Sequence, residues 1–279
     1  MTQEPNSRLA IGVDLGASRI KVTWRSPGND DLYFAHPNQD RAEVADRVRQ
    51  SNAACVALTG AGARAFAREL AAPTRVVAEF EAFGRGAGLL LQRSGSDLAR
   101  PFLGVSLGTG TSMLRIADDE TRRVGGTALG GGTLVGLARG LLGCGDFDKL
   151  RRCASSGDRT KVDLVLADIY EAGDSPLPGD LTAAALEKLG RNENEEANDV
   201  AAALFGLVGE NVGLLAAALA RAENLSSVAY AGSALRDNPL LCDLLRAIPA
   251  LQGLHAVVIE NGEFAASLGA LEMALAGEA

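Results

Sequence analysis

The sequence predicts an α/β protein built from two similar domains, and three observations lead to this fold class. An apolar run that stops at a glycine-containing turn occurs twice, as IGVDLGAS at 11–18 and as LGVSLGTG at 103–110. A second strand-like run and then helical segments follow each copy, so the order of elements repeats along the chain. Hydrophobic residues make up 47% of the 279 residues, which is enough to bury the cores of two domains.

The first half of the chain predicts the element order β-β-β-α-β-α-β-α. Its strands are expected where apolar and β-branched residues lie between turn residues: 9–16, 19–25, 31–36, 55–60 and 75–79. The turn SPGNDD separates the second strand from the third. Its helices are expected where apolar residues recur at helical spacing: 41–50, 63–71 and 80–92.

The second half starts the same order again after Pro101, with additions. Its strands are expected at 102–108, 111–117, 120–126, 226–232 and 255–261. Its helices are expected at 133–143, at 194–224 as one or two helices, and at 238–248 and 263–277. A helical insertion is expected over about 146–210.

Two copies of such a unit predict duplicated ribonuclease-H-like domains, the architecture of actin, the sugar kinases and the heat-shock ATPases. We expect the N-terminal actin-like domain at 1–98 and the C-terminal one at 99–279, with a nucleotide cleft between them. In this architecture one β-hairpin turn from each domain holds the phosphates of ATP. A third glycine-rich turn near the C-terminus holds the adenosine.

The first hairpin turn extends from Asp14 to Lys21. Gly16 permits a tight turn whose bare backbone N–H groups suit a phosphate. Ser18 offers a hydroxyl and Lys21 a positive charge, while Asp14 at the strand end can hold Mg²⁺ or orient an attacking hydroxyl. The alternative is an ordinary hairpin with a capping aspartate.

The second hairpin turn reads Gly108-Thr109-Gly110-Thr111-Ser112. Three hydroxyls and two glycines in five residues are typical of an anion-binding turn. The alternative is a polar loop without a ligand, which the repetition of the pattern disfavours. Ser106 stands where the first copy has Asp14, so only the first of the two turns carries a carboxylate at this position.

The most unusual segment holds six glycines within residues 125–136 and leads directly into a helix. We expect free N–H groups at Gly131 to Val135, because the first N–H groups of a helix have no partner within the helix. Such a helix N-terminus attracts anions. Arg122 and Arg123 precede the glycines, and such a pair can bind a carboxylate bidentately. The alternative is a flexible loop.

Two further strand ends carry candidate residues. Glu79 can act as a general base toward a substrate hydroxyl. On the residues alone, the favoured alternative for Glu79 is a solvated charge in the first turn of a helix, where acidic residues are stabilised. Gly232-Ser233 ends a strand where the adenosine turn is expected, and the alternative there is a plain turn.

Composition excludes several classes of protein. The net charge is −8 and no run of Arg or Lys occurs, which argues against a nucleic-acid partner. Four cysteines without a CxxC pair and only two histidines argue against zinc, and the cysteines fit buried thiols. The start lacks the pattern of a signal peptide, and no run of 18 apolar residues predicts a membrane span, so we expect a cytoplasmic protein.

Several longer motifs resemble one family from about residue 10 to residue 275. They are RRVGGTALGGGTLVGL, EFE after RVVA, GTGTS, SGDRTKVDLVLADIY followed by PLPGDLTAA, YAGSALRDNPLL and VIENGEFAASLGAL. In this order they resemble the type II pantothenate kinases, in the bacterial branch related to the staphylococcal enzyme and to the eukaryotic forms.

The resemblance implies ATP-dependent phosphorylation of pantothenate on its 4′-hydroxyl, the first step of coenzyme A synthesis. It also implies Mg²⁺ and a homodimer built on the long helices of the C-terminal domain. By position, Glu79 is the catalytic base, Asp14 is the second catalytic and metal-binding carboxylate, and Arg123 with Ser112 binds pantothenate. The implied nucleotide-binding residues are Asp14, Leu15, Gly16, Ala17, Ser18, Arg19, Ile20, Lys21, Gly108, Thr109, Gly110, Gly131, Gly132, Thr133, Leu134, Val135, Phe147 and Ser233.

The chain departs from the family pattern in two places. Ala17 stands where the family has a second glycine, and a positive φ there would cost about 1 kcal/mol or more of strain. Aliphatic Val257, Val258 and Ile259 precede ENG in place of aromatic residues. The first departure concerns ATP affinity and the second concerns the substrate side.

Two other functions remain open on the sequence. One is a kinase of the same superfamily that acts on another hydroxyl, such as an amino sugar or a pantetheine-like compound, which would leave Arg123 without a role. The other is a nucleotide or acyl-CoA sensor that binds ATP without turnover. A dehydrogenase is excluded because neither glycine turn has the GxGxxG spacing that opens a helix after a strand.

Overall fold

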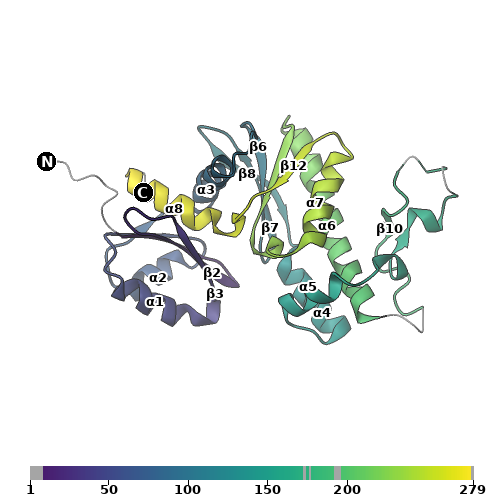
Figure 1. The fold of residues 1–279 in the computed structure, drawn as a ribbon, viewed down its shortest axis with the longest axis horizontal. Helices are drawn as coiled ribbons and strands as arrows, with labels where there is room; N and C mark the ends of the chain where they lie inside the picture. The colour runs from purple at the N-terminus through teal and green to yellow at the C-terminus, as the bar shows by residue number, and fades with distance from the viewer. Residues whose placement is uncertain (1–8, 172–173, 176, 192–195, 278–279) are drawn as a thin grey trace.

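Two five-stranded sheets stand side by side in the computed structural model, with two helices between them (Figure 1). The structure describes residues 9–171, 174–175, 177–191 and 196–277. The expectation of no signal peptide falls largely on residues 1–8, outside the described residues. Small parts of the expected insertion at 146–210 are outside them as well.

The first sheet has the strand order β3-β2-β1-β4-β5. Its strands are β1 (Ala10–Leu15), β2 (Arg19–Arg25), β3 (Leu32–Pro37), β4 (Cys55–Thr59) and β5 (Arg75–Val76). β1 is buried along its whole length, as expected for a central strand whose residues are mostly apolar. The helices α1 (Arg41–Gln50) and α2 (Ala63–Leu70) cover one face, with Val44 and Phe66 in the core.

The second sheet has the strand order β12-β11-β6-β7-β8. Its strands are β6 (Phe102–Leu107), β7 (Thr111–Ile116), β8 (Thr121–Thr127), β11 (Ser227–Ala231) and β12 (His255–Val258). On one face it packs against α6 (Ala197–Ala222), and α7 (Pro239–Ala250) packs against α6 and β12. Read from β8 to β12, this order repeats that of the first sheet from β3 to β5. The predicted duplication is therefore confirmed strand by strand.

The two helices between the sheets are α3 (Glu79–Arg93) and α8 (Ala265–Ala276) (Figure 1). α8 packs on β1, β4 and β2 of the first sheet, although it follows the second sheet in the chain. α3 packs on α8 and contributes Phe83 to the core that covers β6 and β7. A Cβ atom on Gly86 would lie 1.8 Å from the carbonyl oxygen of Ala265, so the two helices touch backbone to backbone.

The expected helical insertion differs from the structure. α4 (Gly131–Leu142) and α5 (Phe147–Ala154) are helices, but two 3-10 turns and a hairpin of β9 (Leu164–Val165) and β10 (Thr182–Ala184) follow them. The segment 197–210 belongs to α6, a single helix that lies in the core. Pro178 and Gly179 favour turns over helix, which is why apolar spacing alone misjudged this segment.

One helix, α6, is long and apolar enough to cross a membrane by length and composition. In the described residues, 78% of its most apolar stretch is buried inside the protein. Its glycines account for the tight packing, because a Cβ atom on Gly213 would lie 2.9 Å from Cβ of Ile248 on α7. α6 is therefore the core helix of the second half.

Candidate active site

Two neighbouring cavities lie where the two hairpin turns face each other. The Glu79 cavity, of about 410 Å³, is lined by both turns together with Glu79 and Arg123. The Phe147 cavity, of about 430 Å³, is lined by both turns, the start of α4 and Phe147. Ser18, Gly108, Thr109 and Ser233 line both, so the two cavities form one continuous site.

The two turns make direct contact across this site. The hydroxyl of Ser18, after β1, lies 2.7 Å from the hydroxyl of Thr109, after β6. Both turns follow central strands with the same antiparallel pairing to the next strand. The repeated sequence pattern thus brings two hydroxyl-bearing turns together from the two halves of the chain.

Asp14 lies at the end of β1, where only 7% of the residue is exposed. Lys21 is its partner across the β1–β2 pair and donates a hydrogen bond of 3.0 Å to Oδ2. A Cβ atom on Gly60 would lie 2.6 Å from Oδ1 of Asp14, and Gly60 has a φ of +88°. The carboxylate is therefore held between a cation and a glycine backbone, with its charge directed to the Glu79 cavity.

Glu79 is the first residue of α3, following Ala78 in an extended conformation. Loss of hydration raises the pKa of the Glu79 carboxyl, the charge of Asp14 raises it further, and Lys21 opposes both effects. A carboxylate with a raised pKa at a cavity wall is suited to accept a proton from a bound hydroxyl. Glu79 is exposed, as a solvated helix charge would be, but it also lines the cavity and has a raised pKa, so the role of general base stays a prediction.

Arg122 and Arg123 point to opposite faces of β8, so the predicted arginine pair is wrong. Arg122 pairs with Glu223 outside the cavities, whereas Arg123 lines the Glu79 cavity. Successive side chains of a strand alternate between its faces, which separates the two guanidinium groups. Within the described residues, no carboxylate is paired with Arg123, so this cation is available to a ligand.

The start of α4 is attached to the second hairpin turn. The N–H of Gly131 donates to the carbonyl of Gly108 at 2.8 Å, and that of Gly132 donates to Thr109 at 2.9 Å. The expectation of free N–H groups at these two residues is therefore wrong, because the turn takes them. Gly130 permits the close approach, since a Cβ atom there would lie 2.7 Å from the carbonyl oxygen of Thr109.

The Phe147 cavity has a more apolar wall and two arginines at its edge. Arg19 and Arg139 line it together with Val135, and Phe147 packs edge-on against Phe205 at 6.0 Å. Nε of Arg19 is buried and has no hydrogen-bond partner among the described residues. Arg139 was not predicted, and its place in the last turn of a glycine-rich helix gave no local signal.

Four of the predicted nucleotide-binding residues do not line the cavities. Leu15, Ile20 and Leu134 have buried side chains in the hydrophobic cores. The hydroxyl of Thr133 donates to the carbonyl of Ala128 at 2.7 Å. The role of these four residues at the nucleotide stays a prediction. Any such role would come from their backbone atoms or from their packing under the site.

Ala17 does not have the positive φ that would strain an alanine. The strain considered for a positive φ therefore does not arise at this position. Its carbonyl accepts a hydrogen bond from Nδ2 of Asn38, which supports the turn from the side of β3.

Sequence reasoning missed the apolar wall of the Glu79 cavity. Phe80, Phe83, Leu114 and Ala266 form it, from α3, β7 and α8. The spacing of Phe80 and Phe83, three residues apart on one helix and directly after Glu79, was a usable signal. Leu114 and Ala266 come together only through the tertiary fold.

The residues around Asp14 fit a magnesium ion carried by a nucleotide. Within the described residues, no group of three or more His, Cys, Asp or Glu side chains could hold a metal ion alone. Mg²⁺ in phosphoryl-transfer sites commonly uses one or two carboxylates, with phosphates and water completing the shell. The single buried carboxylate of Asp14 beside two hydroxyl-bearing turns matches that requirement.

Solved structures with the same fold include proteins with bound ATP analogues. An activator of 2-hydroxyisocaproyl-CoA dehydratase from Clostridium difficile with bound ADPNP has a TM-score of 0.66 and 13% identity, covering 97% of this chain and 95% of that one. A ROK family glucokinase from Streptomyces griseus in complex with glucose and AMPPNP has a TM-score of 0.57 and 18% identity. The match covers 95% of this chain and 98% of that one. At these identities the likeness shows the fold, that of the actin-like ATPases and sugar kinases.

Sequence comparison is more specific. The family model described as Fumble matches residues 29–273. Type II pantothenate kinase of Staphylococcus aureus (strain USA300) is 32% identical over 265 residues, covering 94% of this chain and 98% of that protein. Type II pantothenate kinase of Staphylococcus haemolyticus (strain JCSC1435) is 32% identical over 266 residues, covering 94% of this chain and 99% of that protein. The chain belongs to the Fumble family, the family of the type II pantothenate kinases.

Proposed function

We propose that this protein transfers the γ-phosphoryl group of ATP to the 4′-hydroxyl of pantothenate, the first step of coenzyme A synthesis. One observation carries the proposal beyond family membership. Arg123, a cation without a carboxylate partner in the described residues, lines the same cavity as Glu79. A substrate with a carboxylate at one end and a hydroxyl at the other would engage both groups.

Each residue of the Glu79 cavity has a role in this reaction. Arg123 binds the pantothenate carboxylate through charge-assisted hydrogen bonds, and Ser112 adds a hydroxyl. The apolar wall of Phe80 and Phe83 packs against the dimethyl group of the substrate. Glu79 accepts the proton of the 4′-hydroxyl while that oxygen bonds to the γ-phosphorus and the bond to ADP breaks.

The two hairpin turns and the Phe147 cavity take the nucleotide. The backbone of Gly16 and Gly108, with the hydroxyls of Ser18 and Thr109, surrounds the phosphates. Phe147, Val135 and Ser233 lie against the adenosine in the adjoining cavity. Asp14 would hold Mg²⁺, which neutralises charge on the transferring phosphates when bound.

We infer a homodimer in the cytoplasm. α6 leaves Leu207, Leu214, Leu215 and Ala218 on one partly exposed stripe, and Leu214 is 50% exposed. A second copy of the chain would cover this stripe by two-fold pairing. All four cysteines lie in described residues and are free thiols, which fits a reducing compartment.

A substrate panel tests the proposed activity. ADP release is measured with ATP and Mg²⁺ in the presence of pantothenate, pantetheine or an amino sugar. We expect turnover with pantothenate and a loss of that turnover in Glu79→Gln. Turnover with the sugar alone would indicate another kinase of this fold, and ATP binding without any turnover would indicate a sensor.

A further inference from the structure

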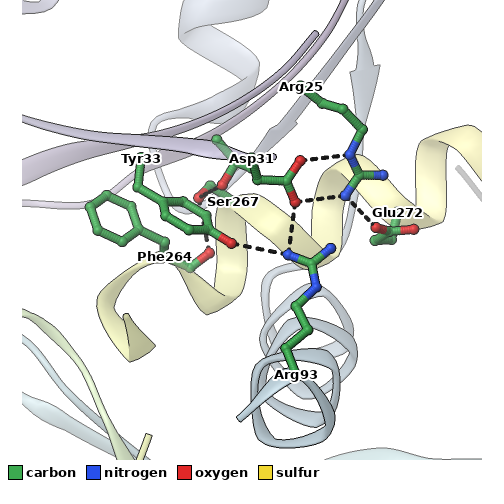
Figure 2. A network of polar contacts seen from close by, with 8 residues as sticks. Arg25, Asp31, Tyr33, Arg93, Phe264, Ser267 and Glu272 are labelled. Atoms are coloured by element: carbon green, nitrogen blue, oxygen red, sulfur yellow. Dashed lines mark hydrogen bonds and ion pairs between the residues drawn. The ribbon is translucent and has the colours of Figure 1, made fainter. Parts of the chain in front are cut away.

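A network of polar and charged side chains joins β2, β3, α3 and α8 at the end of α3 that is far from Glu79 (Figure 2). Asp31 is at its centre, with 4% of its side chain exposed. Arg25 donates two hydrogen bonds to the Asp31 carboxylate, at 2.7 and 2.8 Å, and Arg93 donates one at 2.8 Å. Arg25 also donates to Glu272 on α8 at 2.6 Å, and Arg93 donates to the hydroxyl of Tyr33 at 3.2 Å.

The network connects the far ends of two elements whose near ends lie in the active site. β2 carries Lys21 near the Glu79 cavity and Arg25 at its last position. α3 begins with Glu79 and ends with Arg93, a length of about 22 Å. β2 and α3 are therefore linked through Asp31 at one end, and both line the Glu79 cavity at the other.

Between these ends, the middle of α3 packs backbone to backbone against α8. A Cβ atom on Gly86 would lie 1.8 Å from the carbonyl of Ala265, and one on Gly269 would lie 1.8 Å from the carbonyl of Ala82. Leu90 and Leu91 bury the last turn of α3 in the core, and the Asp31 network adds polar contacts at the same end. Because α3 is one continuous helix, a change in its tilt at the Arg93 end would also move its Glu79 end.

We propose that Arg93 is a positioning residue for Glu79, and that its contact with Asp31 sets the orientation of α3 relative to β2. This inference rests on the proposed function, in which Glu79 must lie within hydrogen-bond reach of the substrate hydroxyl. Misplacement of a reacting group by about 1 Å costs up to roughly 100-fold in rate. The Asp31 network holds the first sheet, α3 and α8 in the arrangement that the reaction requires.

We expect a protein without the Arg93 side chain to fold. Arg93 is 45% exposed and borders an open cavity of about 730 Å³, whereas Arg25 is 18% exposed. Without Arg93, the Asp31 carboxylate keeps both hydrogen bonds from Arg25, so no buried charge is left unpaired. Arg93→Ala therefore tests the position of α3 rather than the integrity of the core.

The kinetic test compares Arg93→Ala with Arg49→Ala. Arg49 is equally exposed, at 45%, and forms an ion pair of 2.7 Å with Asp46 on α1, away from the cavities. In Arg93→Ala, kcat should fall about tenfold or more while KM for pantothenate and ATP stays within about twofold. Arg93→Lys should recover part of the loss, and Arg49→Ala should match the unaltered protein. An unchanged kcat in Arg93→Ala would overturn the inference.

A second readout does not depend on turnover. Fluorine NMR of protein labelled with fluorophenylalanine reports Phe80 and Phe83, assigned by Phe→Leu variants. Both signals should shift in Arg93→Ala and stay in place in Arg49→Ala, although they lie at the other end of α3. Unshifted signals would overturn the inference. If the unaltered protein does not phosphorylate pantothenate, the proposed function fails and the fluorine signals alone decide the role of Arg93.

Discussion

Glu79 shows how a residue with a weak sequence signal becomes a strong candidate through its neighbours. Its place in a first helical turn is ordinary for an acidic residue. Asp14 on β1 and the partial loss of hydration raise its pKa, and neither effect can be inferred from residues next to it in sequence. Family resemblance pointed to Glu79, and its place at the cavity beside Asp14 supports the proposed role.

The raised pKa of Glu79 predicts the pH dependence of the reaction. The base must be ionised, so kcat falls as the pH falls through the pKa of this group. Because burial and Asp14 raise that pKa, the loss should begin at a higher pH than for a free glutamate, whose pKa is about 4.3. A profile of kcat from about pH 4 to pH 8, roughly the range over which such a carboxylate titrates, measures the pH at which activity falls. Glu81→Gln, in the same helical turn, should leave the profile unchanged, and an acid limb at the ordinary glutamate value would contradict the assignment.

Arg123 predicts a substrate effect with a matched control beside it. Arg123→Ala should raise KM for pantothenate roughly 10- to 100-fold, since hydrogen bonds to a charged group contribute about 1.5–3 kcal/mol. Arg122→Ala should change KM little, because Arg122 pairs with Glu223 away from the cavity. Steady-state kinetics of both variants decides this, and equal effects of the two substitutions would refute the role of Arg123.

At the scale of elements, local patterns predicted most of the fold. The hairpins β1–β2 and β6–β7 follow from apolar runs broken by glycine turns, and α1, α2 and α7 follow from helical spacing. The hairpin β9–β10 was missed because its strands have only two and three residues. The packing of α8 on the first sheet could not be predicted, since it joins Arg25 to Glu272 across 247 residues.

The contact between α3 and α8 predicts that Gly269 tolerates no side chain. Alanine normally stabilises a helix by about 1 kcal/mol over glycine. At Gly269 the added Cβ would lie 1.8 Å from the carbonyl of Ala82, so Gly269→Ala should lose about 2 kcal/mol of unfolding free energy. Gly140→Ala is the control, because nothing lies within 4 Å of its Cβ position on α4. Urea unfolding measures both, and a stabilised Gly269→Ala would contradict the close packing.

At the scale of the whole molecule, the active site belongs to neither half alone. Asp14, Ser18 and Glu79 come from the first half, and Thr109, Arg123 and Phe147 come from the second. The sequence predicted this division from the repeated turn, because each copy brings one hairpin turn that we propose binds phosphate. It could not show that the turns touch, as Ser18 and Thr109 do.

A ligand that bridges both halves should stabilise the whole protein. A non-hydrolysable ATP analogue with Mg²⁺, at 100 times its Kd, should add about 2.7 kcal/mol to the unfolding free energy. Thermal unfolding should therefore shift upward with the analogue and much less with adenosine at the same concentration, because adenosine lacks the phosphates that we propose the two turns bind. An equal shift with both ligands would contradict phosphate binding between the turns.

The most direct test of the central claim is the product itself. Pantothenate, ATP and Mg²⁺ are incubated with the protein or with Glu79→Gln, and phosphorus–proton NMR locates the transferred group. We predict a phosphate ester on the 4′-hydroxyl of pantothenate with the unaltered protein and none with Glu79→Gln. Pantothenate left unmodified by the unaltered protein, or the same product from both proteins, would contradict the account.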